Sequence, residues 1–198
     1  MCEVLCVTNR LLCADDFLKR IDSLAKAQPE GIILREKDLS AVEYKSLAES
    51  VLEICEKYGT PCILHSFADA AEELSAKALH LPLSKLRELP SYKRSRFTTL
   101  GASCHSVQDA KEAEALGCTY ITAGHVFDTD CKKGLPGRGL HFLRQVCESV
   151  SLPVYAIGGI NEENAAEVIN AGAKGVCVMS GAMVCGDPKE YLEGFKEI

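Results

Sequence analysis

The 198-residue sequence predicts an α/β protein built on a parallel β-sheet, and two observations lead to this fold class. Eight short runs rich in Val, Ile, Leu and Cys show little polar alternation, which is typical of strands buried on both faces. Each run is followed by a helical or helix-like segment, and such alternation joins parallel strands. Eight units favour closure into a single-domain TIM (β/α)8 barrel spanning 1–198, with an open doubly wound sheet as the alternative.

The elements follow from these runs in chain order. Strands are expected at 4–8, 31–34, 62–65, 78–81, 99–103, 120–124, 154–157 and 175–179. Clear helices are expected at 16–26, 41–58, 107–116, 140–150 and 162–170, with weaker helical pieces at 67–75 and 83–89. Ser106 and Asn161 are expected as N-caps, because acidic residues occupy the turn that follows each of them. Gly117 and Gly172 are expected at helix C-termini.

The composition restricts the kinds of partner. A net charge of -6 and a pI of about 5.4 argue against nucleic acid or an anionic membrane as the main partner. No signal peptide is recognised and no apolar run approaches the length of a membrane span, so a cytoplasmic location is expected. The eleven cysteines form no C-x-x-C pair and several lie in strand-like runs, which favours structural thiols over a metal or redox role.

The residues that follow the strands are the candidate site, because a TIM barrel has its active site at the carboxyl ends of its strands. "AIGGIN" places Gly158 and Gly159 after the seventh strand, and "VMSGAM" places Met179, Ser180 and Gly181 after the eighth. Glycine lets backbone amides approach an anion closely, and the N-terminus of a following helix adds positive potential. These two loops are therefore expected to bind phosphate, with tight turns that bind nothing as the alternative.

Two cations follow the second strand in "ILREKD". In an extended segment Arg35 and Lys37 point to one side and Glu36 to the other. Next to a phosphate site they are expected to contact the anion. A solvated run of surface charge is the alternative, and the residues alone leave it open.

His125 follows the last glycine of the sixth strand and is the candidate general acid and base. Imidazole titrates near neutral pH, so it can both give and take a proton. The loop after it contains Gly134, Gly137 and Gly139, which would serve as hinges of a lid. A histidine hydrogen-bonded to its own loop is the alternative that the residues leave open.

The other histidines and the acids are less informative. His80, His105 and His141 are interpreted as structural or surface residues, and His65 is ambiguous. The acids near the strand ends are Glu36 and Asp38 after the second strand, and Asp128 and Asp130 in the loop after the sixth. They do not offer the converging oxygen ligands that magnesium needs, so no metal and no cofactor is expected.

The motifs "ILREKD", "GASCHS", "GHVFDTDCKKG" and "VYAIGGINEENAAEVINAGAKGVCVMSGA" resemble the thiamine phosphate synthase superfamily. The resemblance spans nearly the whole chain and is strongest over 100–182. The superfamily has two main branches on one barrel. The synthase joins a pyrimidine diphosphate to a thiazole phosphate with magnesium, and the TenI-like thiazole tautomerase aromatises a thiazole phosphate precursor by a proton shift.

Departures from the synthase pattern point to the second branch. Ile33 replaces a glutamine, and His65 and Ser66 replace an Asn-Asp pair at the end of the third strand. Lys85 replaces an aspartate after the fourth strand. The resemblance therefore implies the loss of both acids that would hold magnesium. His125 stands where the synthase has proline, and "GHVFDTDCKKGLPGRG" is similar to the tautomerase, whose histidine at this position is catalytic.

The resemblance thus implies a metal-independent thiazole tautomerase with His125 as its acid and base. Its small-molecule substrate would be a carboxythiazole phosphate, with the carboxylate neutralised by Arg35 and by Lys37 or Lys132. Lys132 and Ser103 match polar residues shared across the superfamily. Two alternatives stay open, namely a magnesium-dependent thiamine phosphate synthase and a non-catalytic paralogue that binds a phosphate ligand. The sequence does not determine the oligomeric state, and a homodimer is the assembly considered.

Overall fold

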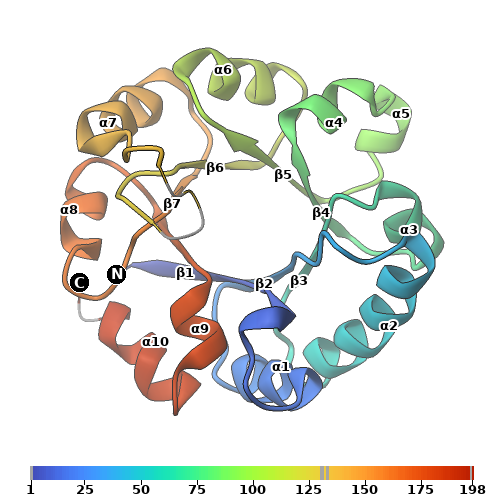
Figure 1. The fold of residues 1–198 in the computed structure, drawn as a ribbon. Helices are drawn as coiled ribbons and strands as arrows, with labels where there is room; N and C mark the ends of the chain where they lie inside the picture. Colours follow the sequence, from blue (N-terminus) through green and yellow to red (C-terminus); the bar gives the residue numbers. More distant parts are fainter. Residues whose placement is uncertain (1, 130–131, 133, 197) are drawn as a thin grey trace.

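A computed structural model describes residues 2–129, 132, 134–196 and 198. Its eight strands close into a barrel in which each strand pairs in parallel with its neighbours in sequence, and β1 pairs with β8. Figure 1 shows this ring of strands enclosed by a ring of helices. The predicted TIM-barrel fold class is confirmed, and the doubly wound alternative is excluded because the sheet is closed.

The elements have the following bounds. The strands are β1 (Glu3–Val7), β2 (Gly31–Leu34), β3 (Cys62–His65), β4 (Ala78–Pro82), β5 (Thr99–Cys104), β6 (Tyr120–Gly124), β7 (Val154–Ile157) and β8 (Gly175–Val178). The helices are η1 (Arg10–Leu12), α1 (Phe17–Lys26), α2 (Ala41–Tyr58), α3 (Ala68–Glu73), α4 (Leu83–Glu88), α5 (Ser91–Arg94), α6 (Val107–Ala115), α7 (Gly139–Ser149), α8 (Ala165–Asn170), α9 (Ser180–Val184) and α10 (Pro188–Lys196).

The helix ends follow local side-chain chemistry. Ser106 accepts the amide of Asp109 and caps α6, as predicted. Gly117 and Gly172 have φ of 89° and 102°, which is the left-handed conformation expected after a helix end. The predicted start of the eighth helix at residue 162 is wrong. The Asn161 side chain accepts two amides of a turn that comes first, so α8 begins three residues later.

Hydrophobic side chains fill two regions. The larger lies between the strands and the helices, and the smaller fills the inside of the barrel. Successive residues of a strand point to opposite faces, so every second residue of each strand faces inward. The interior cluster comprises Leu5, Val7, Ile33, Ile63, Ala78, Tyr120, Tyr155 and Cys177. In the part of the chain that the structure describes, no helix is both long enough and apolar enough to span a membrane.

Candidate active site

At the end of β2, successive side chains point to opposite sides, so the acidic side chain is separated from the basic ones. Ile33 belongs to the interior cluster, so Arg35 and Lys37 continue on the side of the barrel mouth. Glu36 points the other way and is only 2% exposed. Its carboxylate accepts the hydroxyl of Thr8 at 2.6 Å and the backbone amide of Arg10 at 3.1 Å. The opposite orientation predicted for Glu36 is therefore present, and Lys37 lies at the start of the turn that follows β2.

Arg10 forms ion pairs with Glu36 and Asp38, the two acids that follow β2. Its guanidinium donates to both carboxylate oxygens of Asp38 at 2.6 Å and to Glu36 Oε2 at 3.3 Å. Arg10 also lowers the pKa of Asp38 by donating these hydrogen bonds. The acids beside Arg35 and Lys37 are consequently committed to a different cation.

The charges of four cations act on one another at the mouth. Burial lowers the pKa of the Lys37 ammonium, and the charges of Arg35, Lys132 and Lys85 lower this pKa further. The Lys85 Nζ donates to the carbonyl of Ser66 at 3.0 Å, at the end of β3. A group of like charges that destabilise one another is a site that an anion would stabilise.

Below the mouth lies a buried polar chain. The His80 ring is hydrogen-bonded to the Tyr120 hydroxyl and to Ser103 Oγ, each at 2.9 Å. The His65 ring stacks on it at 5.6 Å and bonds Ser66 Oγ at 2.7 Å. Burial lowers the pKa of His65 to about 2 and that of His80 to about 3, so both rings are neutral. Ser103, expected to contact substrate, has its hydroxyl bound to the barrel interior.

His125 is tied to its own loop. Its Nε2 donates to the carbonyl of Leu135 at 3.2 Å, and its carbonyl accepts the amide of Arg138. This is the alternative that the residues left open. No hydrogen bond among the described residues joins His125 to the four cations. His105, interpreted as structural, is hydrogen-bonded to the carbonyl of Gly124 at 2.8 Å.

Gly158 and Gly159 have φ of 104° and 67° after β7. A Cβ on Gly158 would overlap His125, and one on Gly159 would overlap the carbonyl of Asp128. The loop after β6 thus packs directly on the end of β7, as Figure 1 shows. The expectation that a helix N-terminus directly follows these glycines is wrong, because α8 begins only at Ala165.

The loop after β8 keeps the expected order of elements. Met179 occupies the N-cap position of α9 without a side-chain capping bond, and α9 begins at Ser180, so first-turn amides lie at the strand end. Packing also requires glycine at position 181, because a Cβ there would overlap the hydroxyl of Tyr191. Backbone amides suited to phosphate are therefore present after β8, on a helix of only five residues.

The loop between β6 and α7 folds back on itself. Asp128 accepts the amide of Gly137 at 2.6 Å, and the Lys132 carbonyl accepts the amide of Leu135. The Lys132 side chain is exposed. Asp130, one of the acids considered for this loop, lies outside the described residues. These hydrogen bonds connect the described residues of the loop to one another.

The residues present do not fit a magnesium ion at the ends of β3 and β4. The side chains there are His65, Ser66 and Lys85, and the ammonium of Lys85 occupies the Ser66 carbonyl. Across the described ranges, no cluster of three His, Cys, Asp or Glu side chains could hold a metal. Magnesium requires oxygen ligands, and an ammonium beside it would be repelled. The described cysteines are all free.

Two residues of this region were absent from the predicted site. Lys85 lies in the first turn of α4, which directly follows β4, and was interpreted only as the loss of an acid, although its position near a strand end indicated a site residue. His80 was interpreted as structural or surface, and its inward position could have been read from the alternation with Ala78. Its bond to Ser103 depends on the parallel register of β4 and β5, which pairs Pro82 with Ser103.

The fold and the site together define a TIM barrel with a positively charged mouth. The family model described as thiamine monophosphate synthase matches residues 4–182. The thiamine-phosphate synthase of Fusobacterium nucleatum is 32% identical, over 97% of this chain and 94% of the relative. That of Clostridium acetobutylicum is 35% identical, over 89% and 85%. A solved thiamine phosphate pyrophosphorylase from Pyrococcus furiosus is 28% identical, with a TM-score of 0.84 over 98% of this chain and 94% of its own.

The chain belongs to the thiamine monophosphate synthase family, and so to the enzymes of thiamine biosynthesis. The predicted superfamily is confirmed. The predicted tautomerase activity is contradicted, because the two curated relatives, which match most of this chain, are named thiamine-phosphate synthase, and the solved structure is named thiamine phosphate pyrophosphorylase. The names do not single out the TenI-like branch, and the transferase alternative fits them better. In the structure, the histidine behind the tautomerase interpretation is bonded to its own loop.

Proposed function

We propose that this chain is a thiamine-phosphate synthase, a transferase that joins a pyrimidine diphosphate to a thiazole phosphate. The observation that carries the proposal is the family match over residues 4–182, on a barrel whose mouth gathers four cations. A diphosphate leaving group is a concentrated anion. Arg35, Lys37, Lys85 and Lys132 supply the charge to bind it.

The reaction forms one bond and breaks another. The bond from the pyrimidine methylene carbon to a diphosphate oxygen breaks, and the oxygen keeps the electron pair. The thiazole ring nitrogen donates its lone pair to that carbon, which gives a thiazolium cation and free diphosphate. No proton has to move, so the chemical step needs no general acid or base. Negative charge grows on the diphosphate as the bond breaks, and fixed cations stabilise this change.

The remaining predicted site residues take supporting roles in this proposal. The loops after β7 and β8, with Gly158, Gly159, Met179, Ser180 and Gly181, would hold the phosphate of the thiazole through backbone amides. His125 would position the loop after β6 through Leu135, and Ser103 would connect the mouth to the buried His80. Each of these roles is a proposal for mutagenesis.

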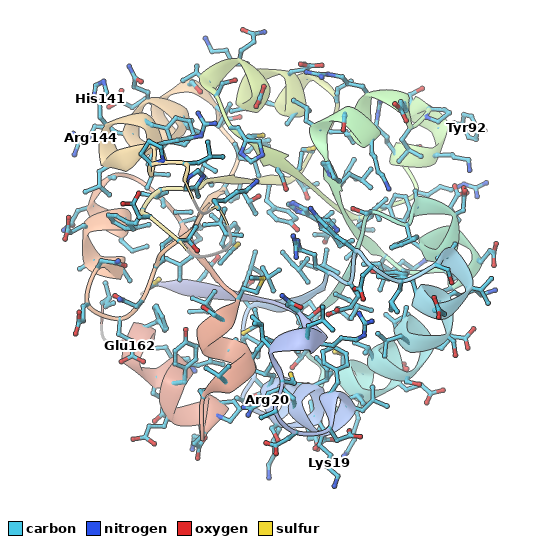
Figure 2. The ribbon with its side chains drawn as sticks, in the orientation of Figure 1. Lys19, Arg20, Tyr92, His141, Arg144 and Glu162 are labelled. Atoms are coloured by element: carbon cyan, nitrogen blue, oxygen red, sulfur yellow. The ribbon has the colours of Figure 1, made fainter. Side chains whose placement is uncertain are left out.

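A growth experiment tests the proposed function. A bacterial strain that lacks its own thiamine-phosphate synthase would receive the gene for this chain, an Arg35→Ala variant or an Arg144→Ala variant. Arg144 lies on the outer surface away from the mouth (Figure 2), which makes it a matched control. The proposal predicts growth without thiamine for the wild type and the control, and poor growth for Arg35→Ala. No rescue by a well-expressed wild type would contradict it.

A further inference from the structure

We propose that Lys85 takes the place of a metal ion in this mouth, so that the chain binds diphosphate through side-chain cations and does not require magnesium. This inference rests on the proposed function, because it names how that site holds its anion. Two observations disagree: the resemblance to the synthase implies a magnesium-assisted transferase, whereas the described side chains at the ends of β3 and β4 do not fit magnesium.

The ends of two neighbouring strands, β3 and β4, position the Lys85 side chain. Lys85 lies in the first turn of α4, which starts directly after β4. Its Nζ is fixed by the carbonyl of Ser66 at 3.0 Å and lies 5.6 Å from the centre of the Phe67 ring. Ser66 has φ of 70°, which is uncommon for a residue other than glycine. Its amide bonds the carbonyl of His80, and its hydroxyl bonds His65. The ammonium is thus held by a defined turn.

The charge of Lys85 reaches the rest of the mouth. It contributes, with Arg35 and Lys132, to lowering the pKa of Lys37, and it also lowers the pKa of the buried His65. In both groups burial is the larger cause, and the neighbouring cations add to it. The charge of Lys85 therefore acts on the same part of the barrel mouth as the charges of Arg35 and Lys37.

Most of the described acids near Lys85 are paired with other cations, and Glu88 offers a single carboxylate. Glu36 and Asp38 are bound by Arg10. A cavity of about 350 Å³ beside Lys85 is also lined by Asp69 and Glu88. Asp69 pairs with Lys93 at 3.2 Å. One remaining carboxylate is a poor magnesium site when an ammonium stands beside it, because magnesium needs several oxygen ligands.

Isothermal titration calorimetry with inorganic diphosphate tests the inference on the whole chain. The proteins are the wild type, Lys85→Ala, Lys85→Arg and Lys19→Ala, each titrated in buffer with EDTA and in buffer with millimolar magnesium. Lys19 lies on the outer surface, far from the mouth (Figure 2), and controls for loss of one positive charge. Circular dichroism melting checks that every variant is folded.

The inference predicts that the wild type binds diphosphate in EDTA and that magnesium does not strengthen binding. Lys85→Ala should weaken binding in EDTA about tenfold or more, because it removes a charged hydrogen-bond donor. Lys85→Arg should retain most of the affinity, and Lys19→Ala all of it. Binding by the wild type only in magnesium, or unchanged binding by folded Lys85→Ala, would overturn the inference.

A turnover assay with both substrates separates this inference from the proposed function. If product forms only with magnesium, the proposed function stands and the role given to Lys85 fails. If diphosphate binds in EDTA with the predicted dependence on Lys85 and no product forms with or without magnesium, the transferase proposal fails and the binding inference stands. Product formation in EDTA that falls with Lys85→Ala supports both.

Discussion

Alternation along one short strand sets the charge of the barrel mouth. Arg35 and Lys37 follow β2 on the side of the mouth, and Glu36 is turned away and bound by Thr8 and Arg10. If the segment slipped by one residue, the carboxylate would face the anion and both cations would leave it. At the scale of single residues, the chemistry therefore depends on register more than on the number of charges.

His125 provides the sharpest prediction at this scale. Because the proposed transfer moves no proton, His125→Asn should lower kcat/KM by less than about tenfold, whereas loss of a true acid or base costs about 10²–10⁴-fold. Steady-state kinetics of the transfer reaction would measure this, with His141→Asn on the outer surface as the control (Figure 2). A fall of several hundredfold would show that His125 transfers a proton.

Gly158 provides a second prediction. Gly158→Ala combines a strained φ of 104° with a Cβ that overlaps His125, so it should lower the free energy of unfolding by about 1–3 kcal/mol. Gly186 is the control, because a Cβ there meets nothing within 4 Å. Urea denaturation measures both variants. Equal stability of Gly158→Ala and wild type would mean that the loop after β6 does not pack on β7 as described.

Single residues of the site were predictable where a strand pattern reached them. The position of Glu36 on the side away from the mouth follows from period-two alternation, which is a local property. The grouping of Lys85 with Ser66 was not predictable, because it depends on β3 and β4 lying side by side with their ends in register. The bond from His125 to Leu135 depends on how a ten-residue loop returns, and no local pattern encodes that path.

The longest helix was predicted over its full range, whereas several shorter helices, including the nine-residue α10, were not expected. The long helix α2 matches the expected range 41–58, because its N-terminus carries a capping box and its C-terminus a left-handed glycine. The short helices α5 and α9 were not expected, since four or five residues show no helical periodicity. The start of α8 was misplaced because the Asn161 side chain stabilises a turn before it.

The capping box of α2 gives a prediction at this scale. Ser40 Oγ accepts the amide of Glu43, and Glu43 accepts the amide of Ser40 at 2.9 Å. Ser40→Ala should therefore lower the free energy of unfolding by about 1 kcal/mol. Ser23→Ala, inside the exposed face of α1, should cost nothing because alanine has the higher helix propensity. Chemical denaturation of the two variants would compare them, and equal stability would refute the cap.

At the scale of the whole molecule, the barrel holds two neutral histidines inside it. His65 and His80 are 5% and 2% exposed, and burial lowers the pKa of each far below that of an unfolded histidine. The unfolded chain therefore binds protons below pH of about 6.5 that the folded chain does not take up until pH of about 3. Folding stability consequently falls as the pH falls through this window.

Urea unfolding at a series of pH values between neutral and mildly acidic measures this effect. The slope of the free energy of unfolding should approach about 1.4 kcal/mol per pH unit for each histidine. His80→Gln should halve that slope, whatever its effect on stability at neutral pH. A stability that stays constant between pH of about 7 and about 5 would mean that neither ring is held neutral.

The transferase proposal is tested most directly by ³¹P nuclear magnetic resonance of the purified wild type mixed with pyrimidine diphosphate and thiazole phosphate. The prediction is that the resonances of the diphosphate ester disappear while inorganic diphosphate and thiamine phosphate appear in equal amounts. Spectra should be recorded with EDTA and with magnesium, so that a metal requirement cannot hide activity. If the ester resonances persist in both buffers beside a folded protein, the chain is not a thiamine-phosphate synthase.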